Sequence, residues 1–167
     1  MKVLENKLAI EIDLIKRIKK YLKLNQYDRA IIDCDELIKS NQKKSQIYYY
    51  KGLAYRGLKK YTKAIENFTK AISINPRFAR SYYKRGEIQA ILGENELAIA
   101  DLSAAIQIDP KYEKAYFYRA LLHHAEAEYE LAFADYENTL FLNPKNQIAA
   151  LNRDIVIKIL RQKLGQT

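Results

Sequence analysis

Two adjacent histidines, His123 and His124, and one cysteine, Cys34, are the side chains of this 167-residue chain best suited to bind a metal ion. Successive residues of a helix point about 100° apart, so the two imidazoles cannot converge on one ion. A single cysteine excludes both a thiolate cluster and an intramolecular disulfide, and we expect Cys34 to be a small apolar core residue. We therefore expect no metal site.

Catalytic patterns are missing from the sequence. GLKKYTKA, residues 57–64, contains lysines but lacks the glycine cradle that binds phosphate groups. We can place no nucleophile with a neighbouring base and no pair of catalytic carboxylates. These observations predict a noncatalytic protein without a cofactor.

The chain repeats with a period of 34 residues. Pro76, Pro110 and Pro144 each follow an Asn or Asp at this spacing, as is typical of helix ends. Alanines recur with the same period, and small residues at one phase let two helices approach closely; they are Ala30, Ala64, Ala98 and Ala132. The spacing predicts a helical repeat.

Residues 45–78 carry the fullest copy of the pattern, with Tyr48, Gly52, Tyr55, Ala64, Phe68, Ala71 and Pro76. This copy resembles the tetratricopeptide repeat, a 34-residue helix–turn–helix unit. Residues 79–112 and 113–146 are further copies, and residues 11–44 are a degenerate one. The resemblance implies an all-α fold: a single domain, residues 1–167, forming a right-handed superhelical solenoid of antiparallel helix pairs.

Additional helical segments are expected at both ends. Residues 147–164 are predicted to form a capping helix, because apolar residues recur there at helical spacing; they are Ile148, Leu151, Ile155, Ile159 and Leu160. Residues 1–10 are expected to lengthen the first helix.

Three consecutive tyrosines, Tyr48 to Tyr50, cannot share one helix face. The resemblance places Tyr48, with its equivalents Tyr82 and Tyr116, in the core between helices. Tyr49, Tyr83 and Phe117 are expected to point into a concave groove, where aromatic rings give a large contact area. Tyr50 shares its phase with Lys16, Lys84 and Tyr118, which are expected at the edge of the groove.

A basic residue also recurs every 34 residues, as Arg17, Lys51, Arg85, Arg119 and Arg153. Asp33, Asn67, Asp101 and Asp135 lie 18 positions before the last four of them. We expect each basic residue to bond this partner on the preceding repeat and hold the repeats in register.

The predicted groove has a basic and aromatic lining, which suits an extended or helical peptide with acidic groups or a free C-terminus. The predicted ligand-binding residues are Lys19, Tyr49, Leu53, Arg56, Arg80, Tyr83, Lys84, Glu87, Lys114, Phe117, Tyr118, Leu121 and His124. The sequence thus favours a protein–protein interaction module, such as an adaptor or co-chaperone.

Some tetratricopeptide proteins clamp the C-terminal carboxylate of heat-shock chaperones with Lys, Asn and Arg side chains. Arg80 and Lys84 match the third-repeat positions of that clamp, but Ile15, Lys19 and Tyr50 replace the others. A strict clamp is therefore not expected, although Arg80 and Lys84 could still bind an aspartate-rich peptide.

Charge is distributed unevenly along the chain. Residues 1–85 contain 21 Lys and Arg against 8 Asp and Glu, whereas residues 86–167 contain 8 against 12. Two alternatives stay open: an RNA-associated protein that uses its basic half, and an assembly subunit that self-associates weakly through its terminal helices. The sequence shows neither a signal-peptide core nor a long apolar segment, so we expect a cytoplasmic protein without membrane contact.

Overall fold

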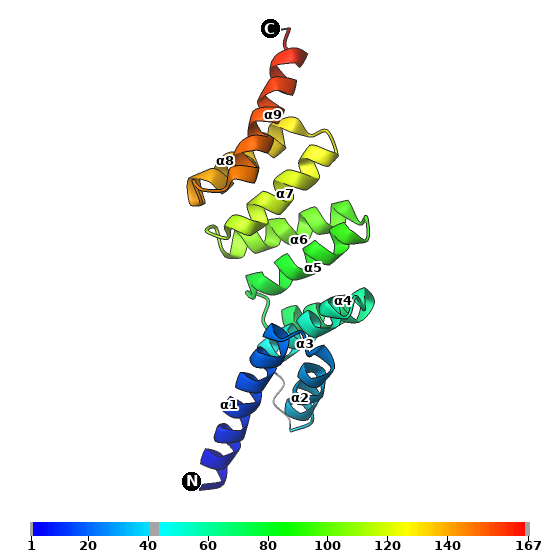
Figure 1. The fold of residues 1–167 in the computed structure, drawn as a ribbon, viewed down its shortest axis with the longest axis vertical. Helices are drawn as coiled ribbons and strands as arrows, with labels where there is room; N and C mark the ends of the chain where they lie inside the picture. Colours follow the sequence, from blue (N-terminus) through cyan, green and yellow to red (C-terminus); the bar gives the residue numbers. More distant parts are fainter. Residues whose placement is uncertain (1, 41–43, 166–167) are drawn as a thin grey trace. The chain divides into compact units, whose positions relative to one another are not determined.

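A computed structural model describes residues 2–40 and 44–165, with side chains from residue 8 onward. This part of the chain forms nine α-helices and no strand, as the sequence predicts (Figure 1). The helices are α1 (Lys2–Lys23), α2 (Tyr27–Lys39), α3 (Ser45–Gly57), α4 (Tyr61–Ile74), α5 (Ala79–Ile91), α6 (Asn95–Ile108), α7 (Glu113–Ala125), α8 (Tyr129–Leu142) and α9 (Gln147–Lys163).

The helices belong to two compact units, which we describe separately. Unit 1 is Met1–Ser81 and unit 2 is Tyr82–Thr167, so the division falls within α5. Residues 1, 41–43, 166 and 167, which the predicted single domain includes, lie outside the described residues. That single domain stays a prediction.

Unit 1 is built from two helix pairs, because α1 packs on α2 and α3 packs on α4. Leu14 and Ile18 of α1 meet Cys34 and Leu37 of α2 in a buried core that also includes Tyr50. Cys34 is fully buried as predicted, and burial raises the pKa of its thiol to about 12.

The close approach of α3 to α4 depends on Gly52. A Cβ atom at this position would lie 2.7 Å from the ring of Phe68. In the last repeat Ala120 occupies the same phase and is accommodated, packing with Ala132 and Tyr136. A Cβ atom therefore fits at position 52 only if the Phe68 ring shifts.

Each turn between the two helices of a repeat contains one residue with a positive φ. These are Asn25 (57°), Lys59 (56°), Gly93 (79°) and Ala127 (59°), which are spaced 34 apart. Left-handed backbone favours glycine, so the three other side chains are held there at a conformational cost.

Unit 2 ends in α9, which packs on α8. The buried side of α9 consists of Ala149 and Val156, and the partly buried Leu160 packs against the same core cluster. The predicted apolar stripe is therefore corrected in part: Ile148, Leu151 and Ile155 are exposed. Ile159, which also belongs to the predicted stripe, is half-buried. A helix with apolar residues on more than one side can bury only one of them against its neighbour.

The predicted pairing of the periodic basic residues is wrong in its partners. Arg17 bonds Asp33 at 2.9 Å, Arg85 bonds Asp101 at 2.7 Å, and Arg119 bonds Asp135 at 2.7 Å, each within its own repeat. The second helix of an antiparallel pair runs back along the first, which brings a residue 16 positions ahead opposite the basic one.

Contacts to the preceding repeat do occur, but at another position. Lys51 bonds Asp35 at 2.6 Å, Arg119 donates to Ser103 Oγ at 2.8 Å, and Arg153 bonds Glu137 at 3.1 Å. Arg119 thus joins two repeats through one guanidinium, because its planar fork donates in several directions.

Candidate functional site

In unit 1, the predicted binding residues lie on α1, on α3 and at the start of α5. Lys19 is exposed, and its Nζ lies 6.0 Å from the centre of the Tyr50 ring. Gln46 donates to the Tyr50 hydroxyl at 2.8 Å. Arg80, at the start of α5, is also exposed, whereas Arg56 is half-buried.

Tyr49 and Leu53 are half-buried and pack against the unit 1 core. The Tyr49 ring lies 5.8 Å from Phe68 and 5.1 Å from Phe78, measured between ring centres. Tyr49 therefore packs against the core, and part of its side chain remains exposed.

The structure changes the predicted division of the three tyrosines. Tyr50, expected at the groove edge, is buried at 8% exposure, whereas Tyr48, expected in the core, is half-buried. Tyr82 and Tyr116 are likewise half-buried, with the guanidinium groups of Arg85 and Arg119 lying 5.7 and 5.9 Å from their ring centres. Each ring thus makes a cation–π contact with an arginine and keeps some exposed surface, so neither tyrosine is fully buried in the core.

In unit 2, Tyr83 is only 2% exposed, which corrects the expectation that it presents an open contact ring. Its ring packs between Tyr112 and Tyr118, with centres 4.9 and 5.7 Å away. Burial, followed by the negative charge of Glu87, raises the pKa of the Tyr83 phenol. Tyr83 is thus neutral at physiological pH and donates to a carboxylate.

That carboxylate belongs to Glu87, which is 6% exposed. It accepts a hydrogen bond from Tyr83 Oη at 3.1 Å and pairs with Lys84 Nζ at 2.7 Å. A buried carboxylate needs such partners. The structure therefore brings three predicted binding residues together, but in contact with each other.

A more open set lies on α7, which we call the α7 face: Lys114, Phe117, Tyr118, Leu121 and His124. Helical spacing places all five on one side of the helix. Lys114 is exposed and the other four are half-buried. Phe117 packs edge-on against Tyr118, with ring centres 6.0 Å apart, and His124 packs against Tyr129 at 5.8 Å. The face combines partly exposed aromatic surface with one cation.

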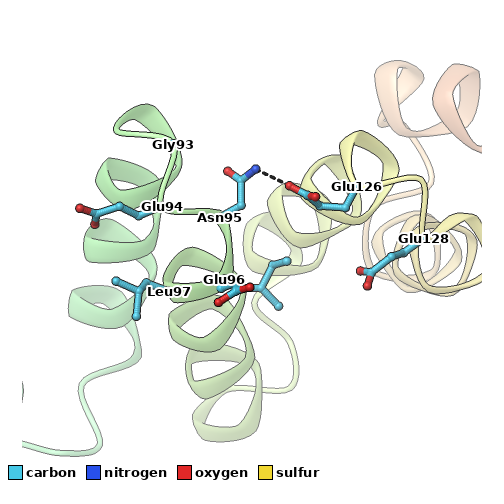
Figure 2. Close-up of a pocket in the computed structure, with 8 residues that line it drawn as sticks. Gly93, Glu94, Asn95, Glu96, Leu97, Glu126 and Glu128 are labelled. Atoms are coloured by element: carbon cyan, nitrogen blue, oxygen red, sulfur yellow. Dashed lines mark hydrogen bonds between the residues drawn. The ribbon is translucent and has the colours of Figure 1, made fainter.

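A pocket of about 570 Å³ lies at the turns of unit 2, and sequence reasoning did not predict it. Figure 2 shows it between the α5–α6 turn and the α7–α8 turn. Four glutamates line it together with Leu97 and Ile99; they are Glu94, Glu96, Glu126 and Glu128. Glu94 and Glu128 occupy the repeat position that Lys60 occupies in residues 45–78. This change from a positive to a negative side chain is the sequence feature that could have indicated the acidic pocket.

Two of these glutamates have partners inside the protein. Asn95 donates to Glu126 at 2.6 Å, which is the dashed bond in Figure 2. His123 is buried, and its Nδ1 lies 2.6 Å from the Glu128 carboxylate.

Over residues 2–40 and 44–165, no three His, Cys, Asp or Glu side chains form a group that could hold a metal ion. None of the described helices has the length and apolar character needed to cross a bilayer.

Comparison with known families follows the repeat pattern. The family model for the tetratricopeptide repeat matches residues 45–78, and a second model, described as TPR repeat, matches residues 89–126. Among solved structures, the TPR domain of Arabidopsis OM64 is 31% identical, with a TM-score of 0.65; the match covers 68% of this chain and 94% of that one. The chain belongs to the tetratricopeptide repeat family.

Two further structures are similar. The first TPR domain of Spaghetti (RPAP3), solved with the HSP90 peptide SRMEEVD, is 28% identical with a TM-score of 0.67, covering 70% of this chain and 93% of that one. MamA is 22% identical with a TM-score of 0.78, covering 89% and 85%. A search of curated proteins finds no match. The fold is that of a protein–protein interaction module.

Proposed function

We propose that this protein is a noncatalytic, cytoplasmic adaptor or co-chaperone that binds a peptide segment of a partner. The observation that carries the proposal is the α7 face, where partly exposed Phe117 and Tyr118 lie one helical turn from the exposed cation Lys114. Aromatic side chains supply contact area with few rotamers to order, and a cation steers an acidic partner.

Acidic character in the peptide is supported by the exposed cations at predicted positions. Lys114 in unit 2, and Lys19 and Arg80 in unit 1, are exposed. The peptide bound to the RPAP3 domain ends in two glutamates, a valine and an aspartate. Lys84 contributes less, because its ammonium is already paired with Glu87.

The test is a fluorescence-anisotropy titration of the full chain with labelled acidic, neutral and basic 12-residue peptides, and with SRMEEVD. We expect acidic peptides to bind best, and the variant Lys114→Ala/Phe117→Ala to lose at least about tenfold in affinity. Lys145→Ala, which removes another exposed unit 2 cation, is the matched control. Equal affinity for all three peptide classes, or unchanged binding in the double variant, would remove the α7 face from consideration.

A nucleic-acid partner is the second candidate, favoured by exposed lysines at the α3–α4 turn of unit 1, Lys59, Lys60 and Lys63. Phosphate contacts release counterions, so binding to a single-stranded RNA oligonucleotide would fall steeply with salt. An RNA affinity that is higher than that of any peptide and lost in Lys59→Glu/Lys60→Glu would favour this candidate over the peptide proposal.

A further inference from the structure

The outward side of α9 carries apolar residues that no described part of the chain covers. Ile148, Leu151 and Ile155 recur at spacings of three and four, so they lie on one side of the helix. Their exposed fractions are 62%, 64% and 40%. The opposite side, through Ala149 and Val156, packs on the last repeat.

This outward side ends in positive charge. Lys158 continues it one turn beyond Ile155, and Arg161 borders it; both are exposed. Asp154, the helix's one carboxylate, is paired with Arg153 at 2.9 Å. We call Ile148, Leu151, Ile155, Lys158 and Arg161 the α9 face: apolar in its first half and cationic in its second.

The turn pocket of the same unit has the complementary character. Leu97, which is 55% exposed, and Ile99 supply apolar surface. Glu94 and Glu96 are exposed and form no ion pair with a described residue, and Glu126 and Glu128 add further negative charge. A volume of about 570 Å³ can hold several side chains but no whole helix.

We propose that the α9 face of one copy of this chain docks on the turn pocket of a second copy. Lys158 and Arg161 meet the glutamates of the pocket, while the isoleucines and Leu151 cover Leu97 and Ile99. The chain itself supplies both complementary surfaces, which is why the occupant is a second copy. Because each copy carries both surfaces, two copies can dock reciprocally, each α9 face on the other's pocket, which gives a two-fold symmetric dimer with two identical contacts.

The proposal does not depend on peptide binding by the α7 face, and sedimentation velocity of the full chain at rising concentration tests it. We expect a monomer–dimer equilibrium that weakens as salt screens the exposed charges. A chain that stays monomeric at several hundred micromolar protein would overturn the proposal, since mutual docking gives a dimer at such concentrations.

Charge reversal on each surface gives a sharper result. Lys158→Glu/Arg161→Glu and, separately, Glu94→Lys/Glu96→Lys should each weaken dimerisation about tenfold or more, because both contacts become repulsive. These four side chains have no partner within the described protein, so we expect both variants to keep their helical circular dichroism. Lys39→Glu, on the exposed side of α2, is the control and should dimerise normally.

Mixing the two variants is the decisive step. In a mixed dimer, glutamates on one α9 face meet lysines in the other pocket, and the remaining contact is native, so dimerisation should return. Folded variants that dimerise as well as the wild type, or a mixture that stays monomeric, would show that these two surfaces are not partners.

Discussion

Tyr49 and Tyr83 occupy the same place in consecutive repeats, but their surroundings differ. Tyr49 is half-buried against Phe68 and Phe78, with Leu53 four residues on. Tyr83 is buried between two tyrosines and donates to Glu87, the residue equivalent to Leu53. A repeat phase therefore determines which way a side chain points, whereas its neighbours determine whether the side chain is available to a ligand.

The largest expected effect follows from this difference. Tyr83→Ala should lower the free energy of unfolding by about 3–5 kcal/mol, because it leaves a cavity and removes a donor from Glu87. Tyr49→Ala should cost clearly less, since its ring is partly exposed. Urea denaturation followed by circular dichroism would compare them, and similar losses in both variants would contradict the contrast.

The ion pairs of the periodic basic residues also differ between the two units, because their carboxylate partners are buried to different degrees. Asp135→Ala in unit 2 should cost about 2–3 kcal/mol, since it leaves the partly buried Arg119 without its bidentate acceptor. Asp35→Ala in unit 1 should cost less than about 1 kcal/mol, because the Asp35 side chain is 42% exposed and water screens its pair with Lys51. Thermal denaturation of both variants measures the difference. A greater loss from Asp35→Ala would show that burial does not rank these pairs.

A substitution at Glu87 should make Lys84, which is paired inside the protein, more available to a ligand. Glu87→Gln removes the charge that pairs with Lys84 while keeping the side-chain volume, so affinity for acidic peptides should rise about threefold to tenfold. The measurement is the same anisotropy titration, with Glu130→Gln, on the exposed part of α8, as the control for net charge. An equal rise in both variants would mean that overall charge alone is responsible.

The smallest expected effects concern the equivalent turn residues Lys59 and Gly93. Gly93→Ala should cost about 1 kcal/mol, purely because of its φ of 79°, since a Cβ there meets no atom within 4 Å. Lys59→Gly should stabilise unit 1 by about 0.5 kcal/mol by relieving left-handed strain. Differential scanning calorimetry would resolve the two signs, and destabilisation by Lys59→Gly would show that the side chain makes compensating contacts.

Much of the fold was predictable from local patterns. Proline and alanine recurring every 34 residues predicted the helix pairs, and the expectation that Cys34 is a core residue is met by its burial. The predicted binding residues fared differently, because Lys84 and Glu87 interact with each other and Tyr83 is closed in by Tyr112 and Tyr118. Such contacts depend on which neighbours happen to be large or charged, and a repeat template does not contain that information.

The amino-acid sequence by itself determined the 34-residue helical repeat and the repeat family to which the chain belongs, because these depend on contacts between nearby residues and on periodicity. Tertiary structure alone decided that Arg119 bonds Asp135 and that α9 buries Ala149 and Val156 while Ile148 and Leu151 stay exposed. It also decided that four glutamates from two repeats share a pocket. These outcomes depend on how helices pack in space, and packing selects among faces that the sequence pattern leaves equivalent.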